Sequence, residues 1–276
     1  MSINEADMER FHTDGIVTLS PNFPRGWLQS ANEAINTLDE TEFNPEGGRG
    51  LAGWYMGGVV QPQLLKLVYD RFFEDAAKRV LRADAVELTL VSLRVTKPKP
   101  NAAAALEPQH VDFKCGTASA GSTPVAMPCG FFVWLTDVQA DNFPLYYRPG
   151  SHLQVMHYMD NHPDDNNHEI QQAPPNLQYA PAVPVFAQSG QVSTLSGTLV
   201  HGGSVTPGHR ERRLLVIEFR AKGTDFPLYA QLEERSRKYL QELKNHVPSD
   251  RLHLLPEKAK IYSTTAPKIS RHEDEN

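Results

Sequence analysis

The stretch VELTLVSLRV at residues 86–95 decides the fold, because its β-branched and aliphatic side chains are typical of a strand. Similar short runs follow: GFFVWL at 130–135, TLVH at 198–201 and LLVIEFR at 214–220. Proline and glycine separate these runs, without the intervening helical patterns that βαβ units need. The sequence therefore predicts a β core, which could be a sandwich, a barrel or a jelly roll.

Helical patterns precede this core. Apolar residues recur every four positions from Leu64 to Val80, which indicates one helix. Ser2 and Glu5 have the spacing of a capping box, which predicts a short helix at the start of the chain. Residues 1–85 are therefore expected to form a mostly helical support for the β core.

The remaining segments complete a single predicted domain of residues 1–276. Within the β core at 86–222, the polar and proline-rich interval 153–188 is expected to be a lid, because long irregular loops are usually functional. Helical spacing returns at 223–248, which predicts a closing helix. Residues 249–276 show little periodicity and are expected to be a tail.

Composition excludes several classes of protein. The 27 Lys and Arg against 33 Asp and Glu give a net charge of −6, which argues against nucleic acid as a partner. No run of about 18 apolar residues suggests a membrane span, and the acidic start does not resemble a secretory signal. The two cysteines, Cys115 and Cys129, are expected to be reduced thiols, which favours a cytoplasmic protein. A small molecule is the expected partner, and the oligomeric state stays open.

Three side chains are candidates for a metal site. Alternation along a strand places His110 and Asp112 on one face, where they supply two thirds of the facial triad of a non-haem iron site. His-x-Asp alone is a weak motif. His201, which ends an apolar run before two glycines, is a candidate third ligand; its alternative role is that of an ordinary hydrogen-bonded histidine at a strand end.

Arg212 stands at the start of the apolar strand that runs to Phe219. If it points into a barrel it needs an anion, since an unpaired buried charge is costly, and a carboxylate would suit a guanidinium. The alternative is a surface arginine at a turn, which the neighbouring Arg210 and Arg213 make plausible for two of the three.

The order of His-x-Asp, a distant His-Gly and an arginine eleven residues later resembles the phytanoyl-CoA dioxygenase family of Fe(II)- and 2-oxoglutarate-dependent oxygenases. Segments 132–138, 141–145 and 148–152 also resemble the central strand, the acidic turn and the Pro-Gly-Ser-His segment of that family. The resemblance covers residues 8–222. It implies a mainly β protein with flanking helices (α+β), folded as a double-stranded β-helix, the cupin-like jelly roll.

The resemblance also implies roles for individual residues. His110, Asp112 and His201 would hold Fe(II), and Arg212 would bind the distal carboxylate of 2-oxoglutarate, with Arg213 as the alternative if the register shifts by one.

Five further residues receive roles that remain open. Trp134 and Thr136 are expected near 2-oxoglutarate, with core packing as the alternative. Trp54, Tyr55 and Met56, in a glycine-rich stretch expected to be irregular, could contact the substrate or anchor their loop on the core.

The sequence departs from the family pattern at two positions near the site. Gly203 stands where relatives often carry a hydroxyl that helps to hold the co-substrate, and Glu107 lies in the segment where an aromatic residue is common. The expected activity is oxidation, most simply hydroxylation, of a small organic molecule with O2, releasing succinate and CO2. A cupin-like metalloenzyme that does not use 2-oxoglutarate, and a non-catalytic jelly-roll binding protein, are the alternatives.

Overall fold

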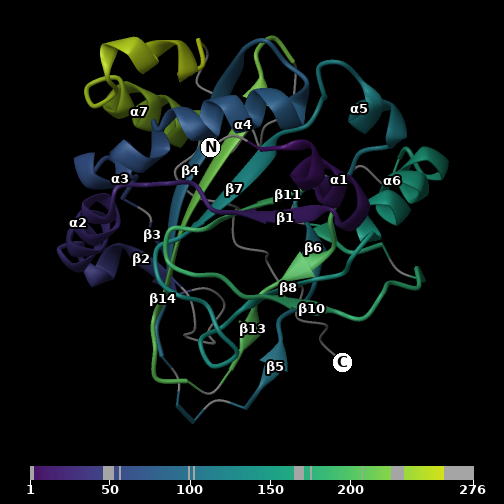
Figure 1. Ribbon diagram of the computed structural model, residues 1–276, viewed down its shortest axis with the longest axis horizontal. Helices are drawn as coiled ribbons and strands as arrows, with labels where there is room; N and C mark the ends of the chain where they lie inside the picture. Colours follow the sequence, from purple (N-terminus) through teal and green to yellow (C-terminus); the bar gives the residue numbers. More distant parts are fainter. Residues whose placement is uncertain are drawn as a thin grey trace.

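The computed structural model describes residues 3–45, 53–55, 57–98, 100–101, 103–164, 171–174, 176–206, 208–224 and 233–257. Its centre consists of antiparallel sheets, with helices around them (Figure 1). This is the jelly-roll α+β fold that the sequence predicts.

The larger sheet runs in the order β1 (Ile16–Leu19), β11 (Val192–Leu195), β7 (Cys129–Trp134), β14 (Arg212–Ala221), β4 (Val86–Thr96), β3 (Gly53–Tyr55) and β2 (Phe43–Pro45). The smaller sheet runs in the order β10 (Val183–Val185), β8 (Leu145–Tyr147), β12 (His201–Gly202), β6 (His110–Val111) and β9 (Gln171–Gln172). Strands β5 (Ala105–Leu106) and β13 (Ser204–Val205) pair separately. The four stretches that suggested the fold lie in β4, β7, β12 and β14 or immediately beside them.

The central strands bury both faces. On β14, Leu214 and Val216 point inward and pack with Trp134 of β7, while Leu215 and Ile217 belong to a second cluster on the outer face. Leu145 and Val185 of the smaller sheet join the inner cluster, so the two sheets face each other. A strand buried on both faces reads as a continuous apolar run, which is why β4 and β14 are recognisable in the sequence.

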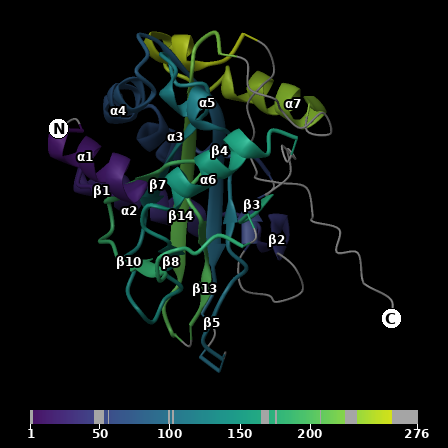
Figure 2. The same cartoon turned by 90° about the vertical axis from the view of Figure 1, so that its right-hand side faces the viewer.

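Helices cover the outer face of the larger sheet. The described helices are α1 (Glu5–Asp14), α2 (Arg25–Asn36), α3 (Pro62–Val68), α4 (Arg71–Leu81), α5 (Thr117–Gly121), α6 (Ser151–Asn161) and α7 (Glu233–Leu243), with short 3-10 turns η1 (Glu40–Glu42) and η4 (Ser249–Leu254). Figure 1 shows α2, α3, α4 and α7 grouped on one side. Helix α5 contacts α6, and its Ala120 carbonyl accepts a hydrogen bond from Arg82 at the end of α4. Figure 2 shows the same elements from a second side. Aromatic packing joins α4 to the sheet: the ring centroids of Phe73 and Phe131 lie 5.5 Å apart.

Two of the predicted helices differ in their limits. The helix predicted from Leu64 to Val80 is two helices, because the Asp70 side chain accepts a hydrogen bond from the backbone of Phe72 and starts α4 anew. At the start of the chain, Asn4 and Asp7 form the capping box of α1. The Ser2–Glu5 box is therefore wrong, since Asn4 occupies the N-cap position.

The predicted lid and tail contain regular structure. The lid interval begins inside α6, where Val155 and Met159 are buried, and its residues 165–170 and 175 lie outside the described part of the chain. The predicted tail opens with η4, which buries Leu254. Both segments are rich in polar residues and contain only a few buried apolar ones. Composition alone therefore did not predict their helical structure.

Cys115 and Cys129 are both free thiols, as expected. The cytoplasmic location inferred from them stays a prediction. Within the described helices, none has the length and apolar character needed to cross a membrane.

Replacing Phe131 by Ala should lower the free energy of unfolding by about 3–5 kcal/mol, the usual loss for a buried phenylalanine. Phe131 is fully buried and its ring contacts those of Phe73 and Phe219. Phe186, which is 53% exposed, provides the control, and Phe186→Ala should change stability by less than about 0.5 kcal/mol. Urea denaturation followed by circular dichroism measures both variants, and equal losses would contradict this account of the core.

Candidate functional site

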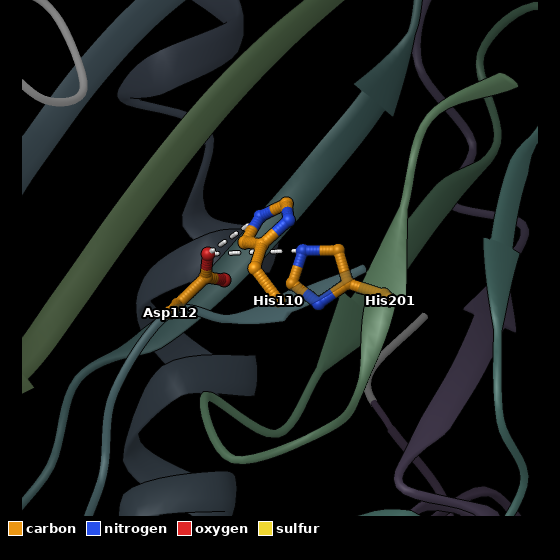
Figure 3. A group of neighbouring side chains, drawn as sticks. All are labelled: His110, Asp112 and His201. Atoms are coloured by element: carbon orange, nitrogen blue, oxygen red, sulfur yellow. Dashed lines mark ion pairs between the residues drawn. The ribbon is translucent and has the colours of Figure 1, made fainter. Parts of the chain in front are cut away.

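His110, Asp112 and His201 meet between the two sheets. His110 of β6 is the direct cross-strand partner of His201 of β12, and their ring centroids lie 4.5 Å apart. Asp112 follows β6, and its Oδ1 lies 3.7 Å from Nε2 of each histidine (Figure 3). Ligand atoms of all three residues lie within 4.8 Å of one another. The structure thus brings together residues that are ninety positions apart in the chain.

Hydrogen bonds orient the two imidazoles. Nδ1 of His201 lies 2.9 Å from the carbonyl oxygen of Leu199, and since a carbonyl only accepts, this nitrogen carries the proton and Nε2 keeps its lone pair toward Asp112. The ring of His110 likewise has a hydrogen-bond partner in the backbone of Pro108. Burial, together with nearby His201, lowers the pKa of His110 to about 4. His110 is therefore neutral near pH 7, which is the form that binds a metal.

The donor set suits a first-row transition metal. Two imidazoles and one carboxylate are the donors of a facial triad, the arrangement that non-haem Fe(II) oxygenases use. About 30% of the Asp112 side chain is exposed, and so is about the same share of the His110 side chain, so solvent and small molecules reach the group. The residues present therefore fit an iron ion.

Arg212 is the first residue of β14 and lies on the strand face that lines the space between the two sheets. It is 3% exposed, and its guanidinium donates to the carbonyl oxygen of Phe143 and to Oγ1 of Thr96, the latter at 3.2 Å. Its buried Nε has no hydrogen-bond partner among the described residues. Burial and the neighbouring Arg94 lower the pKa of Arg212 to about 9, against a smaller opposing effect of Glu107. A guanidinium with an unsatisfied donor in this setting fits a bound carboxylate.

Arg213 points away from this interior. Its guanidinium donates to the carbonyl oxygen of Asn32 at 2.8 Å and to Oδ1 of Asn36 at 2.5 Å, both on α2, and it forms an ion pair with Glu211. Successive residues of a strand face opposite sides of the sheet, which is the reason for the difference between Arg212 and Arg213.

Trp134 and Thr136, the two residues expected near 2-oxoglutarate, have different surroundings. Trp134 is fully buried in the inner cluster, where its indole nitrogen donates to Oγ of Ser193 at 2.9 Å. Strand β7 ends at Trp134, so alternation no longer applies to Thr136. Its hydroxyl oxygen accepts a hydrogen bond from the backbone of Arg213 at 3.0 Å.

The glycine-rich stretch contains strand β3, contrary to the expectation that it is irregular. Trp54 faces the interior, and the Arg94 guanidinium lies 5.2 Å from the centre of its ring. Tyr55 alternates to the outer face, where it is 5% exposed and packs against Phe43. Of the two, only Trp54 therefore faces the space between the sheets, and Met56 lies outside the described residues.

Three residues on inward-facing strand positions have no role in the sequence-based prediction: Phe132, Arg94 and Glu218. The ring of Phe132 lies 6.5 Å from that of His201. Arg94 forms an ion pair with Glu107 at 3.7 Å, and a side chain on Gly203 would collide with the Glu107 carboxylate. The Glu107 carboxylate therefore occupies the space beside Gly203. Alternation along a strand could have indicated two of these residues. Phe132 lies two positions from Trp134, and Glu218 lies six positions from Arg212, so each shares a strand face with a residue already assigned to the site.

The chain matches the family model described as phytanoyl-CoA dioxygenase (PhyH) over residues 11–213. Solved structures share its fold at low identity. SnoN, described as a non-heme alpha ketoglutarate dependent epimerase from nogalamycin biosynthesis, has a TM-score of 0.63 at 18% identity, covering 83% of this chain and 88% of its own. HygX from Streptomyces hygroscopicus, solved with nickel and 2-oxoglutarate, has a TM-score of 0.57 at 15% identity, covering 80% and 88%.

EctD from S. alaskensis, solved with 2-oxoglutarate and 5-hydroxyectoine, has a TM-score of 0.58 at 16% identity, covering 82% of this chain and 78% of its own. No curated protein matches the sequence. At these low identities the solved structures show only that the fold is shared. The family match over residues 11–213 is what assigns the protein to its family.

Replacing His201 by Ala should weaken Fe(II) binding by more than about 100-fold, since loss of an outer-shell partner alone costs 10–100-fold. His162, an exposed histidine that stacks on Tyr158, offers a matched control, and His162→Ala should bind Fe(II) like the wild type. Anaerobic titration calorimetry measures both. Unchanged affinity in His201→Ala would show that the three residues are not the metal site.

Proposed function

The chain belongs to the phytanoyl-CoA dioxygenase family of Fe(II)- and 2-oxoglutarate-dependent oxygenases, and we propose that it hydroxylates a small organic molecule with release of succinate and CO2. In this proposal His110, Asp112 and His201 hold Fe(II), and Arg212 binds the distal carboxylate of 2-oxoglutarate. The observation that carries it is the convergence of the three ligand atoms within 4.8 Å, in the same interior as a buried arginine.

Each side chain has a defined task in this mechanism. Fe(II), when bound with 2-oxoglutarate and O2, supplies the oxidation of a C–H bond and the decarboxylation of the keto acid. The Leu199 carbonyl keeps His201 in the tautomer that binds metal. Asp112 supplies the negative charge that offsets part of the charge of the ion. Trp134, fixed by Ser193, forms a dry wall beside the co-substrate and excludes water from it.

Arg212 supports 2-oxoglutarate rather than a monoacid as the co-substrate. Its two hydrogen bonds to Thr96 and Phe143 hold the guanidinium in place, so little conformational entropy is lost when a carboxylate binds to the remaining donors. Arg213 is engaged by Asn32 and Asn36 on the outer face. This geometry supports Arg212 over Arg213 as the residue that binds the diacid.

A small organic substrate is consistent with the neighbouring structures. Those proteins were solved with nogalamycin RO, hygromycin B or 5-hydroxyectoine, which are all small molecules. We propose that Trp54, which faces the interior from β3, contributes to the wall of the substrate site.

Arg212→Met should raise the KM for 2-oxoglutarate by about 100-fold, because charge-assisted hydrogen bonds each contribute roughly 1.5–3 kcal/mol. Fe(II) affinity should stay close to that of the wild type, since Arg212 is not among the metal-binding residues. The measurements are succinate formation at varied 2-oxoglutarate and anaerobic Fe(II) titration.

Arg213→Met serves as the matched control and should leave the KM for 2-oxoglutarate within about threefold. The reverse result, a large effect for Arg213→Met alone, would contradict the register assigned to β14. Absence of both succinate formation and a visible charge-transfer band from Fe(II) with 2-oxoglutarate would contradict the proposed function itself.

A further inference from the structure

Glu218 is an acidic residue on the inner face of the central strand of the larger sheet. It lies on β14, which is bordered by β4 and β7, and its cross-strand partners are Leu90 and Gly130. Glu218 and Arg212 share a face because they are six residues apart, and this spacing corresponds to about 20 Å along a strand. Glu218 therefore lies at the opposite end of the interior from the arginine assigned to 2-oxoglutarate.

The interior is open at the Glu218 end. Glu218, Gly130 and Phe132 are only half-buried although they lie on central strands, whereas the outward-facing neighbours Ile217 and Phe219 are fully buried. Solvent therefore reaches these three residues from the space between the sheets.

The missing side chain of Gly130 leaves room between the carboxylate and the aromatic ring. A Cβ atom at Gly130 would lie 3.7 Å from Cγ of Glu218, 3.9 Å from its Oε1 and 3.7 Å from Cε1 of Phe132. Phe132 in turn approaches His201, with 6.5 Å between the ring centroids. Glu218 and Phe132 thus flank one space that borders on the metal-binding residues.

Charge is divided along this interior. Arg94 lies across from Leu214, close to Arg212, and its charge acts on His110. Burial, together with the charge of Asp112, raises the pKa of Glu218 to about 8, a shift that a cation bound beside the carboxyl group would oppose. The triad therefore lies between a basic end, which suits a diacid, and an acidic end.

We propose that Glu218 is a specificity-determining residue that pairs with a protonated amine of the substrate, with the Phe132 ring against the same cation. This inference rests on the proposed function and names the class of substrate, a small amine. A carboxylate and an aromatic face are together a favourable environment for an ammonium group. Glu218 is not itself a metal ligand, because it lies outside the group of ligand atoms within 4.8 Å.

A purely structural role predicts a different response to substitution. Glu218 has no ion-pair partner among the described residues, and a half-buried carboxylate without one costs free energy. Glu218→Gln should therefore fold at least as stably as the wild type in urea denaturation. A marked loss of stability would show that the carboxylate supports the fold and would overturn the proposal.

The binding test uses protein loaded with Zn(II) and 2-oxoglutarate and three probes of matched shape: cyclohexylmethylamine, cyclohexylmethanol and cyclohexanecarboxylate. Ligand-observed NMR titration gives their dissociation constants. The wild type should bind the amine about 10-fold or more tightly than the alcohol, the effect of one charge-assisted hydrogen bond, and bind the carboxylate most weakly. In Glu218→Gln the preference for the amine should disappear.

Glu33→Gln, an exposed substitution on α2, is the matched control and should keep the preference for the amine. The proposal is overturned if the wild type binds no amine, binds it no better than the alcohol, or if Glu218→Gln keeps the preference. The visible band formed by Fe(II) with 2-oxoglutarate, recorded for wild type and Glu218→Gln, tests the proposed function separately. A normal band without preference for the amine refutes only the role of Glu218.

Discussion

The cross-strand pair formed by His110 and His201 is the constraint on which the site depends. Because the side chains of a strand alternate between faces, a shift of β12 by one residue against β6 would turn His201 away from the interior. In this pair the ring centroids lie 4.5 Å apart. Asp112, the residue directly after β6, completes the metal-binding group. Each strand contributes only two residues, so the surrounding sheets must hold this register.

The same alternation separates the two functions of β14. Its outward residues, such as Leu215 and Phe219, pack under the helices and stabilise the sheet. Its inward residues run from Arg212 through two apolar side chains to Glu218. The strand thus carries a basic group, Arg212, and an acidic group, Glu218, at opposite ends of the space between the two sheets. A diacid and a cationic substrate approaching the metal from these two ends would each meet a complementary charge.

Burial explains where the sequence analysis differed from the structure. Strands buried on both faces, such as β4 and β14, were recognisable because their apolar runs are continuous. The break between α3 and α4 was not, because the apolar period continues across Asp70 while the backbone is capped there. Helix α6 opens a segment rich in polar residues and buries only a few side chains, among them Val155 and Met159, which composition alone does not distinguish from a loop.

The sequence by itself indicated the class of this protein through a resemblance to a known family. The motifs that carry the resemblance are His-x-Asp on a strand, a distant His-Gly and an arginine on an apolar strand, and each is a local pattern of consecutive or nearly consecutive residues. Only the tertiary structure decided which side chains share the interior. Arg212 faces it and Arg213 does not, Trp54 faces it and Tyr55 does not, and Glu107 fills the space beside Gly203. The physical reason is that facing depends on strand register and strand limits, which are set by pairing and packing with residues far away in the chain.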